Sequence, residues 1–165
     1  MRRLRHAPVS RTLVALVAHA WMALTCAIHF SGSAHAQDHE THAITSLIGA
    51  TWDKPDSKVE TDPVVISGQF AVASWTQGDR GGRALLRKED ERWKVVLCSG
   101  DPLKSASGLV EAGVPAPDAN KIAEDLSAAE ARAPAERRAK FSLFEGTVFG
   151  DADTHHPDAH HQHNH

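Results

Sequence analysis

Four short segments with strand character follow one another in the middle of this 165-residue chain, and no other feature constrains its fold as strongly. Apolar and β-branched residues dominate each segment, and glycine or acidic residues interrupt the pattern between them. The segments are 59–66, 70–76, 83–88 and 92–98. A parallel pair of strands needs a crossover of about a dozen residues or more, and these connections are far shorter. The pattern therefore predicts a four-stranded antiparallel meander.

Apolar side chains alternate along two of these segments. The expected faces are Ala71, Ala73 and Trp75 against Phe70, Val72 and Ser74, and Trp93, Val95 and Leu97 against Lys94, Val96 and Cys98. Successive side chains of a strand point to opposite faces, so the sheet is expected to bury at least one face.

Helical patterns precede and follow the strands in the sequence. Thr41 is expected to cap a helix whose apolar residues recur at three-and-four spacing as far as Trp52. After the strands, Gly113 and Pro134 separate three further helical segments. These segments are 103–112, 118–132 and 134–144. We expect an α+β domain at residues 37–149, with an N-terminal helix and about three C-terminal helices on one face of the sheet and a single core.

The first 36 residues have the features of a secretory signal peptide. Four arginines precede an apolar run from Leu13 to Phe30, and small residues ending at Ala36 form a cleavage signature. The alternative is a retained membrane anchor. It is disfavoured because the run is only marginally long enough to span a bilayer and is interrupted by His19 and His29. We therefore expect cleavage after Ala36 and a periplasmic protein that does not insert into the membrane.

Removal of this leader changes the chemistry of the remaining chain. Four arginines and no acidic residue leave with it, so the formal net charge changes from −3 to −7. An acidic chain attracts cations and is unsuited to nucleic acid. Both methionines and Cys26 also leave, so Cys98 is the one remaining thiol and no internal disulfide is expected. Copper(II), zinc and nickel suit the remaining nitrogen and oxygen donors better than copper(I) does.

The end of the chain, residues 150–165, is predicted to be a disordered metal-binding tail. Six of its last eleven residues are histidines, with no apolar residue larger than alanine between them. They are His155, His156, His160, His161, His163 and His165. Imidazole is a ligand for copper, zinc and nickel, and several imidazoles on one flexible strand can share an ion in many geometries.

A second group of candidate metal ligands lies at the N-terminus that cleavage would create. Gln37, Asp38 and His39 would offer a free amine, two amides and an imidazole. These four nitrogens can surround copper(II) or nickel(II) in the tetragonal geometry that both ions prefer. His42 follows nearby as a further candidate ligand. The four-nitrogen site requires a free amine, so cyclisation of Gln37 to pyroglutamate would abolish it, and the alternative is a solvated lead-in to the helix.

Several motifs in the middle of the chain resemble a known family. They are Asp53-Lys54-Pro55-Asp56-Ser57, the stretch SWTQGDRGGRALLR at 74–87, Trp93, Leu97-Cys98-Ser99-Gly100-Asp101, and Phe144-Glu145-Gly146-Thr147-Val148. Over residues 43–148 the chain resembles the small exported proteins called copper uptake system-associated proteins. The resemblance implies a bacterial periplasmic protein that is encoded with copper acquisition components and is not an enzyme. It implies no ligand set, and the histidine tail lies beyond it.

The first hypothesis is therefore a periplasmic accessory protein that captures or buffers copper(II) for an uptake receptor, transporter or chaperone, with zinc or nickel less favoured. No histidine occurs between His42 and His155, so neither a catalytic triad nor a zinc-hydrolase pair can be assembled inside the domain.

Two alternatives remain open at the level of sequence. One is a small-ligand-binding or catalytic domain with an incidental tail. Its polar groups would be Asp79, Arg80, Arg83, Cys98 and Asp101, converging in one cleft. The other is a structural adaptor for a membrane transporter, which would dock through exposed tryptophans.

Overall fold

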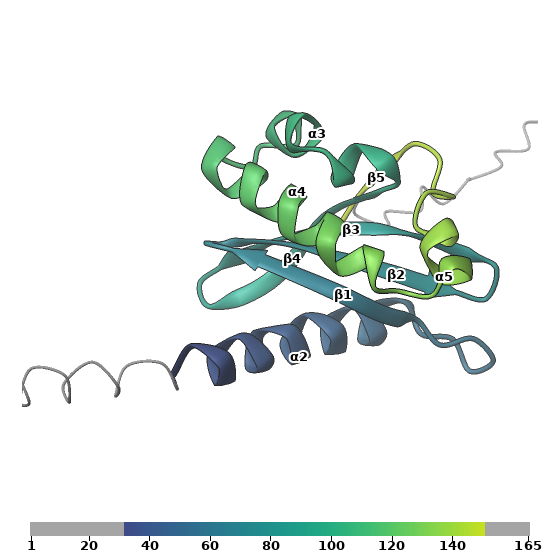
Figure 1. Ribbon diagram of the computed structural model, residues 1–165. Helices are drawn as coiled ribbons and strands as arrows, with labels where there is room; N and C mark the ends of the chain where they lie inside the picture. The colour runs from purple at the N-terminus through teal and green to yellow at the C-terminus, as the bar shows by residue number, and fades with distance from the viewer. Residues whose placement is uncertain (1–31, 151–165) are drawn as a thin grey trace, which may run out of the picture. The chain divides into compact units, whose positions relative to one another are not determined.

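The computed structural model describes residues 32–150 (Figure 1). Residue contacts divide the chain into two units, Met1–Asp38 and His39–His165. The described part of the first unit is the beginning of helix α2 (Gly32–Trp52), and the second unit contains the rest of α2 and the whole sheet. Most of the predicted signal peptide, and the predicted tail from Asp151 onward, lie outside the described residues.

The described residues form an antiparallel sheet in which spatial order follows sequence order. The strands are β1 (Glu60–Ser67), β2 (Phe70–Gln77), β3 (Arg80–Glu89), β4 (Arg92–Ser99) and β5 (Thr147–Phe149). The predicted α+β class and antiparallel meander are confirmed, but the prediction of four strands is wrong because β5 returns from the C-terminal end and pairs with β4. A three-residue strand is too short to show a period-2 pattern.

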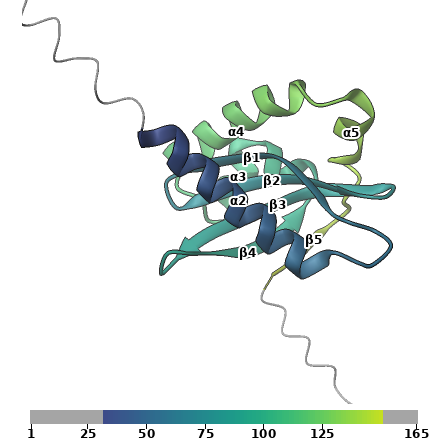
Figure 2. The ribbon, with the colours of Figure 1, turned by 90° about the horizontal axis from the view of Figure 1, so that it is seen from below.

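The helices of the second unit cover both faces of the sheet. After β4 come the 3₁₀ helix η1 (Asp101–Lys104), α3 (Ala106–Glu111), α4 (Ala116–Ala131) and α5 (Ala135–Lys140). The part of α2 from His39 onward lies on one side of the sheet, and α3 and α4 lie on the other (Figures 1 and 2). The prediction of helices on one face with a single core is therefore wrong.

Two hydrophobic clusters result from this arrangement. On the α2 side, Ile44 and Ile48 are fully buried against small strand residues and Leu86. On the α4 side, Ile122 and Leu126 are fully buried against a different set of strand side chains. This second set includes Val65, Val72, Leu85 and Leu97. β2 and β3 thus carry buried apolar side chains on both faces, as expected for strands covered on both sides.

Helix α2 begins earlier than its sequence pattern predicts. Thr41, the expected cap, lies inside the helix and not at its start. The predicted apolar stripe is confirmed, since Ile44 and Ile48 are fully buried and Leu47 and Trp52 are partly buried against the same cluster. In the described residues no helix has both the length and the apolar character needed to cross a lipid bilayer.

A β-bulge in β4 changes which side chains share a face. Leu85 pairs with Leu97, whereas the next residue, Leu86, pairs with Val95, so one extra residue lies in β4 between these pairs. Leu97 consequently joins the α4-side cluster, while Trp93 and Val95 belong to the α2 side. The prediction that Trp93, Val95 and Leu97 share one face is wrong, because a bulge interrupts the alternation that it assumed.

The glycines after β2 also differ from expectation. Between the second and third predicted strand segments, Gly78 and Asp79 form a short turn, and β3 begins at Arg80, ahead of the predicted start at Arg83. Gly81 and Gly82 are buried strand residues, and both approach other parts of the chain closely. A Cβ at Gly81 would lie 2.7 Å from the Lys140 carbonyl oxygen. Glycine in a strand often marks such a close approach.

Candidate functional site

The structure places the predicted N-terminal ligands on α2. Gln37, in the first unit, and His39 and His42, in the second, are all exposed. His39 and His42 are three residues apart, which puts them on neighbouring positions of one helix face. The predicted cleavage after Ala36 falls within α2. Within residues 32–150, no group of three or more His, Cys, Asp or Glu side chains is arranged to hold a metal ion.

The predicted tail ligands lie outside the described residues, but the point where the tail joins the domain is described. Gly150 follows β5, and its N–H donates to the Val96 carbonyl oxygen at 2.8 Å. The first tail histidine, His155, is therefore five residues beyond a backbone position that is hydrogen-bonded to the sheet.

A cavity of about 210 Å³ lies beside this junction, on the α2 side of the sheet. The end of α2, the residue before β1, strands β2 to β5 and the segment before β5 all contribute to it. Its lining residues are Trp52, Val59, Trp75, Gln77, Arg80, Val95, Cys98, Phe144, Val148, Phe149 and Gly150. Most of these side chains are apolar, and the cavity brings together residues that are almost a hundred positions apart in the sequence.

Aromatic contacts and one amide shape the wall of this cavity. The rings of Trp75 and Phe144 meet edge to face with centroids 5.9 Å apart. The side-chain amide of Gln77 donates to the carbonyl oxygens of Trp52 and Ser57, both at 2.9 Å, and so ties β2 to the end of α2. In contrast, Trp75 Nε1 is buried and has no hydrogen-bond acceptor.

Cys98 faces this cavity because of the bulge in β4. Burial raises the pKa of its thiol to about 11, since an apolar environment disfavours the charged thiolate. The thiol is therefore neutral near pH 7 and acts as a polarizable apolar group.

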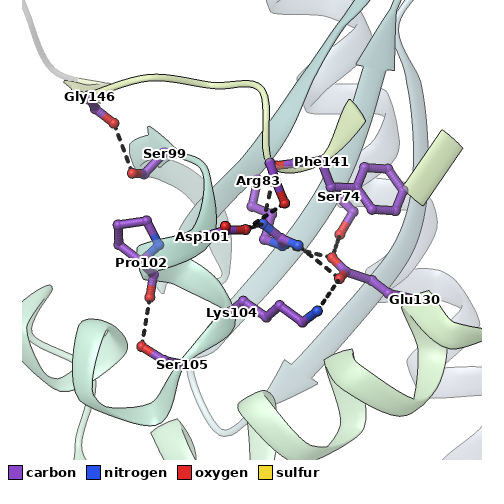
Figure 3. Close-up of polar contacts among 11 residues, drawn as sticks. Ser74, Arg83, Ser99, Asp101, Pro102, Lys104, Ser105, Glu130, Phe141 and Gly146 are labelled. Atoms are coloured by element: carbon purple, nitrogen blue, oxygen red, sulfur yellow. Dashed lines mark hydrogen bonds and ion pairs between the residues drawn. The ribbon is translucent and has the colours of Figure 1, made fainter. Parts of the chain in front are cut away.

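On the other side of the sheet, Arg83 and Glu130 form a buried ion pair that joins β3 to α4 (Figure 3). Each side chain is 1% exposed. Arg83 Nε donates to Glu130 Oε1 at 2.7 Å and Nη2 donates to Oε2 at 2.9 Å. The Ser74 hydroxyl also donates to Glu130 Oε1 at 2.7 Å. Both charges are thus paired and hydrogen-bonded, as burial requires.

The remaining donors of Arg83 connect the C-terminal segment to the sheet. Nη1 donates to the Phe141 carbonyl oxygen at 3.1 Å and to Asp101 Oδ1 at 3.3 Å. A hydrogen bond from Ser142, with the nearby Arg83 charge, lowers the pKa of the Asp101 carboxyl. With these bonds made, Arg83 holds α4, η1 and the segment after α5 together, and we interpret it as structural.

The five polar residues of the small-ligand hypothesis do not converge in one cleft. Arg83 and Asp101 belong to the buried ion-pair network, and Arg80 and Cys98 line the cavity on the opposite side of the sheet. Asp79 is exposed, with its Oδ1 3.9 Å from Lys140 Nζ.

The tryptophans of the domain are not the exposed side chains that the adaptor hypothesis requires. Trp93 is 8% exposed and donates its indole N–H to Glu40 of α2, and Trp52 and Trp75 are partly buried. The large apolar side chains that are exposed in residues 32–150 are Val110, Leu143, Val148 and Phe149. Val148 and Phe149 lie at the cavity, and sequence patterning alone did not select them.

Comparison with known proteins adds no relative to this picture. No protein-family model, curated protein or solved structure matches this chain.

Proposed function

We propose that this protein is an exported, periplasmic accessory protein that captures copper(II) through its chain ends and presents it to an uptake system. The observation that carries the proposal is the density of imidazoles in the tail, six in eleven residues, attached five residues after a backbone position that is hydrogen-bonded to β4. Zinc and nickel are the alternative ions, because the same nitrogen donors bind them.

The described domain supports a division between chain ends that are rich in metal-ligating side chains and a middle that is poor in them. Its residues contain no cluster of three metal-ligating side chains, and the one cysteine of the sheet is a neutral thiol in an apolar cavity. A mobile tail would let each ion exchange among several histidine pairs, which favours many weak contacts and transfer to a partner over permanent storage. The domain would then recognise the receptor, transporter or chaperone.

The helical start of the processed chain is compatible with the proposed N-terminal site. In a chain that begins at Gln37, the amides of Asp38 and His39 would be among the first four N–H groups of a helix. Those groups have no acceptor within a helix. Copper(II) could therefore replace their protons without breaking a helical hydrogen bond. His42 would lie one turn further along and could serve as an additional ligand.

The resemblance to copper uptake system-associated proteins supports the periplasmic location, the copper context and the absence of enzymatic activity. The resemblance identifies no metal ligand, so the proposed ligands are inferred from the sequence of the two chain ends alone.

Calorimetric titration of copper(II) into the full processed chain tests the proposal. Replacing the six tail histidines by glutamine should remove most binding sites, and replacing His39 by glutamine should remove the N-terminal site while leaving those of the tail. Parallel titrations with zinc and nickel establish the preferred ion. Unchanged stoichiometry after loss of the six tail histidines would refute the role of the tail.

Acidification provides an independent test. Imidazoles have an ordinary pKa of about 6.5, and only the neutral ring binds metal. Copper binding by the tail is therefore expected to fall steeply below about pH 6. Binding that persists unchanged at pH 5 would exclude imidazole as the principal ligand.

A small-ligand-binding domain is the second candidate, and the apolar cavity beside β5 favours it. This candidate differs from the sequence hypothesis in its residues, since Arg83, Asp101 and Asp79 lie elsewhere.

A further inference from the structure

The cavity beside β5 has the size and lining of a site for one small ring. An engineered cavity of about 150 Å³ with apolar walls binds benzene, and this one measures about 210 Å³. Four aromatic side chains, Trp52, Trp75, Phe144 and Phe149, contribute to its walls. Such walls suit an aromatic ring, because edge-to-face and offset contacts add to simple burial.

The polar groups of the lining leave little to hold water. The Gln77 amide already donates to Trp52 and Ser57, and the Cys98 thiol is a weak donor. A single bound water needs two to four polar partners, so the lining favours a ligand with an apolar body.

The charge of the cavity lining indicates which polar group a bound ligand would carry. Arg80 is the one charged residue in the lining, which contains no aspartate or glutamate. It is exposed, and its Nη2 donates to Gln77 Oε1 at 3.4 Å, at the weak end of the range. An anionic group can therefore approach this guanidinium without displacing a carboxylate.

We propose that this cavity binds a small monocyclic aromatic carboxylate, with its ring among Trp52, Trp75 and Phe144 and with Arg80 as the donor to its carboxylate. The site is independent of the histidines at the chain ends and does not rest on the proposed copper function. It uses residues from the sheet, from the end of α2 and from the segment before β5, so it exists only when the domain is folded.

Nuclear magnetic resonance of the full chain, kept free of metal, tests this site directly. The probe is phenylacetate, and 2-phenylethanol is its neutral counterpart. The indole N–H resonance of Trp75, assigned with Trp75→Phe, should shift in a saturable manner with phenylacetate. A shift that never saturates, at any soluble concentration, overturns the proposal.

Matched variants separate the charge from the cavity. Arg80→Gln, at an exposed position, should weaken phenylacetate binding at least tenfold and leave 2-phenylethanol binding unchanged. Val148→Trp places bulk in the lining, whereas Val110→Trp adds the same bulk on α3, away from it; both positions are exposed. Only Val148→Trp should abolish binding. Equal binding of phenylacetate and 2-phenylethanol would refute the proposed ligand class. Equal effects of the two tryptophan variants would refute the proposed site.

Discussion

Removing the acidic partner of Arg83 should destabilise this domain more than almost any other single substitution. Glu130→Ala would leave a guanidinium that is 1% exposed with only the Phe141 carbonyl and the exposed carboxylate of Asp101 as acceptors. It would also remove the acceptor of the Ser74 hydroxyl. The substituted protein would therefore bury a charge whose remaining counterion is an exposed carboxylate, and a hydroxyl donor that lacks its partner.

Breaking a buried ion pair from one side costs about 3–5 kcal/mol, and we expect about 4 kcal/mol for Glu130→Ala. Whole domains are stable by only about 5–15 kcal/mol, so this is a large fraction of the free energy of unfolding. With a urea m-value of about 2 kcal/mol/M, the unfolding midpoint should fall by about 2 M. The double variant Arg83→Met/Glu130→Leu removes both charges and should recover most of the loss.

Urea unfolding followed by circular dichroism measures these differences. Asp101→Asn is the matched control, because it removes the other carboxylate near Arg83 but at a side chain that is 69% exposed, where an ion pair contributes at most about 1 kcal/mol. A cost below about 1 kcal/mol for Glu130→Ala, or a double variant as unstable as the single one, would refute the interpretation of this pair as the link between β3 and α4.

Three further predictions concern local geometry. Gly82→Ala should lower the free energy of unfolding by about 1–3 kcal/mol, because its Cβ would lie 2.8 Å from Phe144 Cβ. Gly49→Ala in α2 meets only ordinary contacts and should raise it by about 0.5–1 kcal/mol, so equal effects in thermal unfolding would contradict this reasoning. Cys98 should react with iodoacetamide at pH 8 about 100-fold more slowly than a thiol with the ordinary pKa of 9.0, because its own pKa is about 11. The reaction rate should rise with pH, and rapid alkylation at pH 8 would show that the thiol is not buried as described. Hydrogen bonds from Lys88 and Trp93 lower the pKa of Glu40, so its contribution to stability is present above its ordinary pKa of 4.5 and is lost as pH falls through the lowered value. Glu40→Gln should therefore cost about 1 kcal/mol at pH 7 and have no effect at about pH 2, as measured by urea unfolding at both values.

Local patterns in the sequence were sufficient for the meander and for the buried stripe of α2. Short turns leave neighbouring strands no arrangement except the antiparallel one. Ile44 and Ile48 recur at the period of a helix, so they share a face in any fold that keeps the helix. The histidine-rich tail, likewise, is evident from composition, since its proposed chemistry depends on the number of imidazoles and not on a precise geometry.

Other features depend on residues that are distant in the sequence. The bulge that separates Leu97 from Val95 is set by how β4 pairs with β3, and β5 exists only because β4 offers it an edge. The cavity takes its walls from Trp52 at one end of the domain and Phe149 at the other. Arg83 and Glu130 are 47 positions apart, and each alone resembles an ordinary charged surface residue.

Periodicity records which residues of one helix or strand face the same way, because that relation is local to the backbone. It carries no information about which elements then meet. Register, buried charge pairs and cavity walls arise from that meeting, where packing and desolvation between distant segments decide the outcome. Most of the elements and the proposed metal-binding ends were therefore accessible from the chain itself, and the two-sided core, the Arg83–Glu130 pair and the cavity were decided in three dimensions.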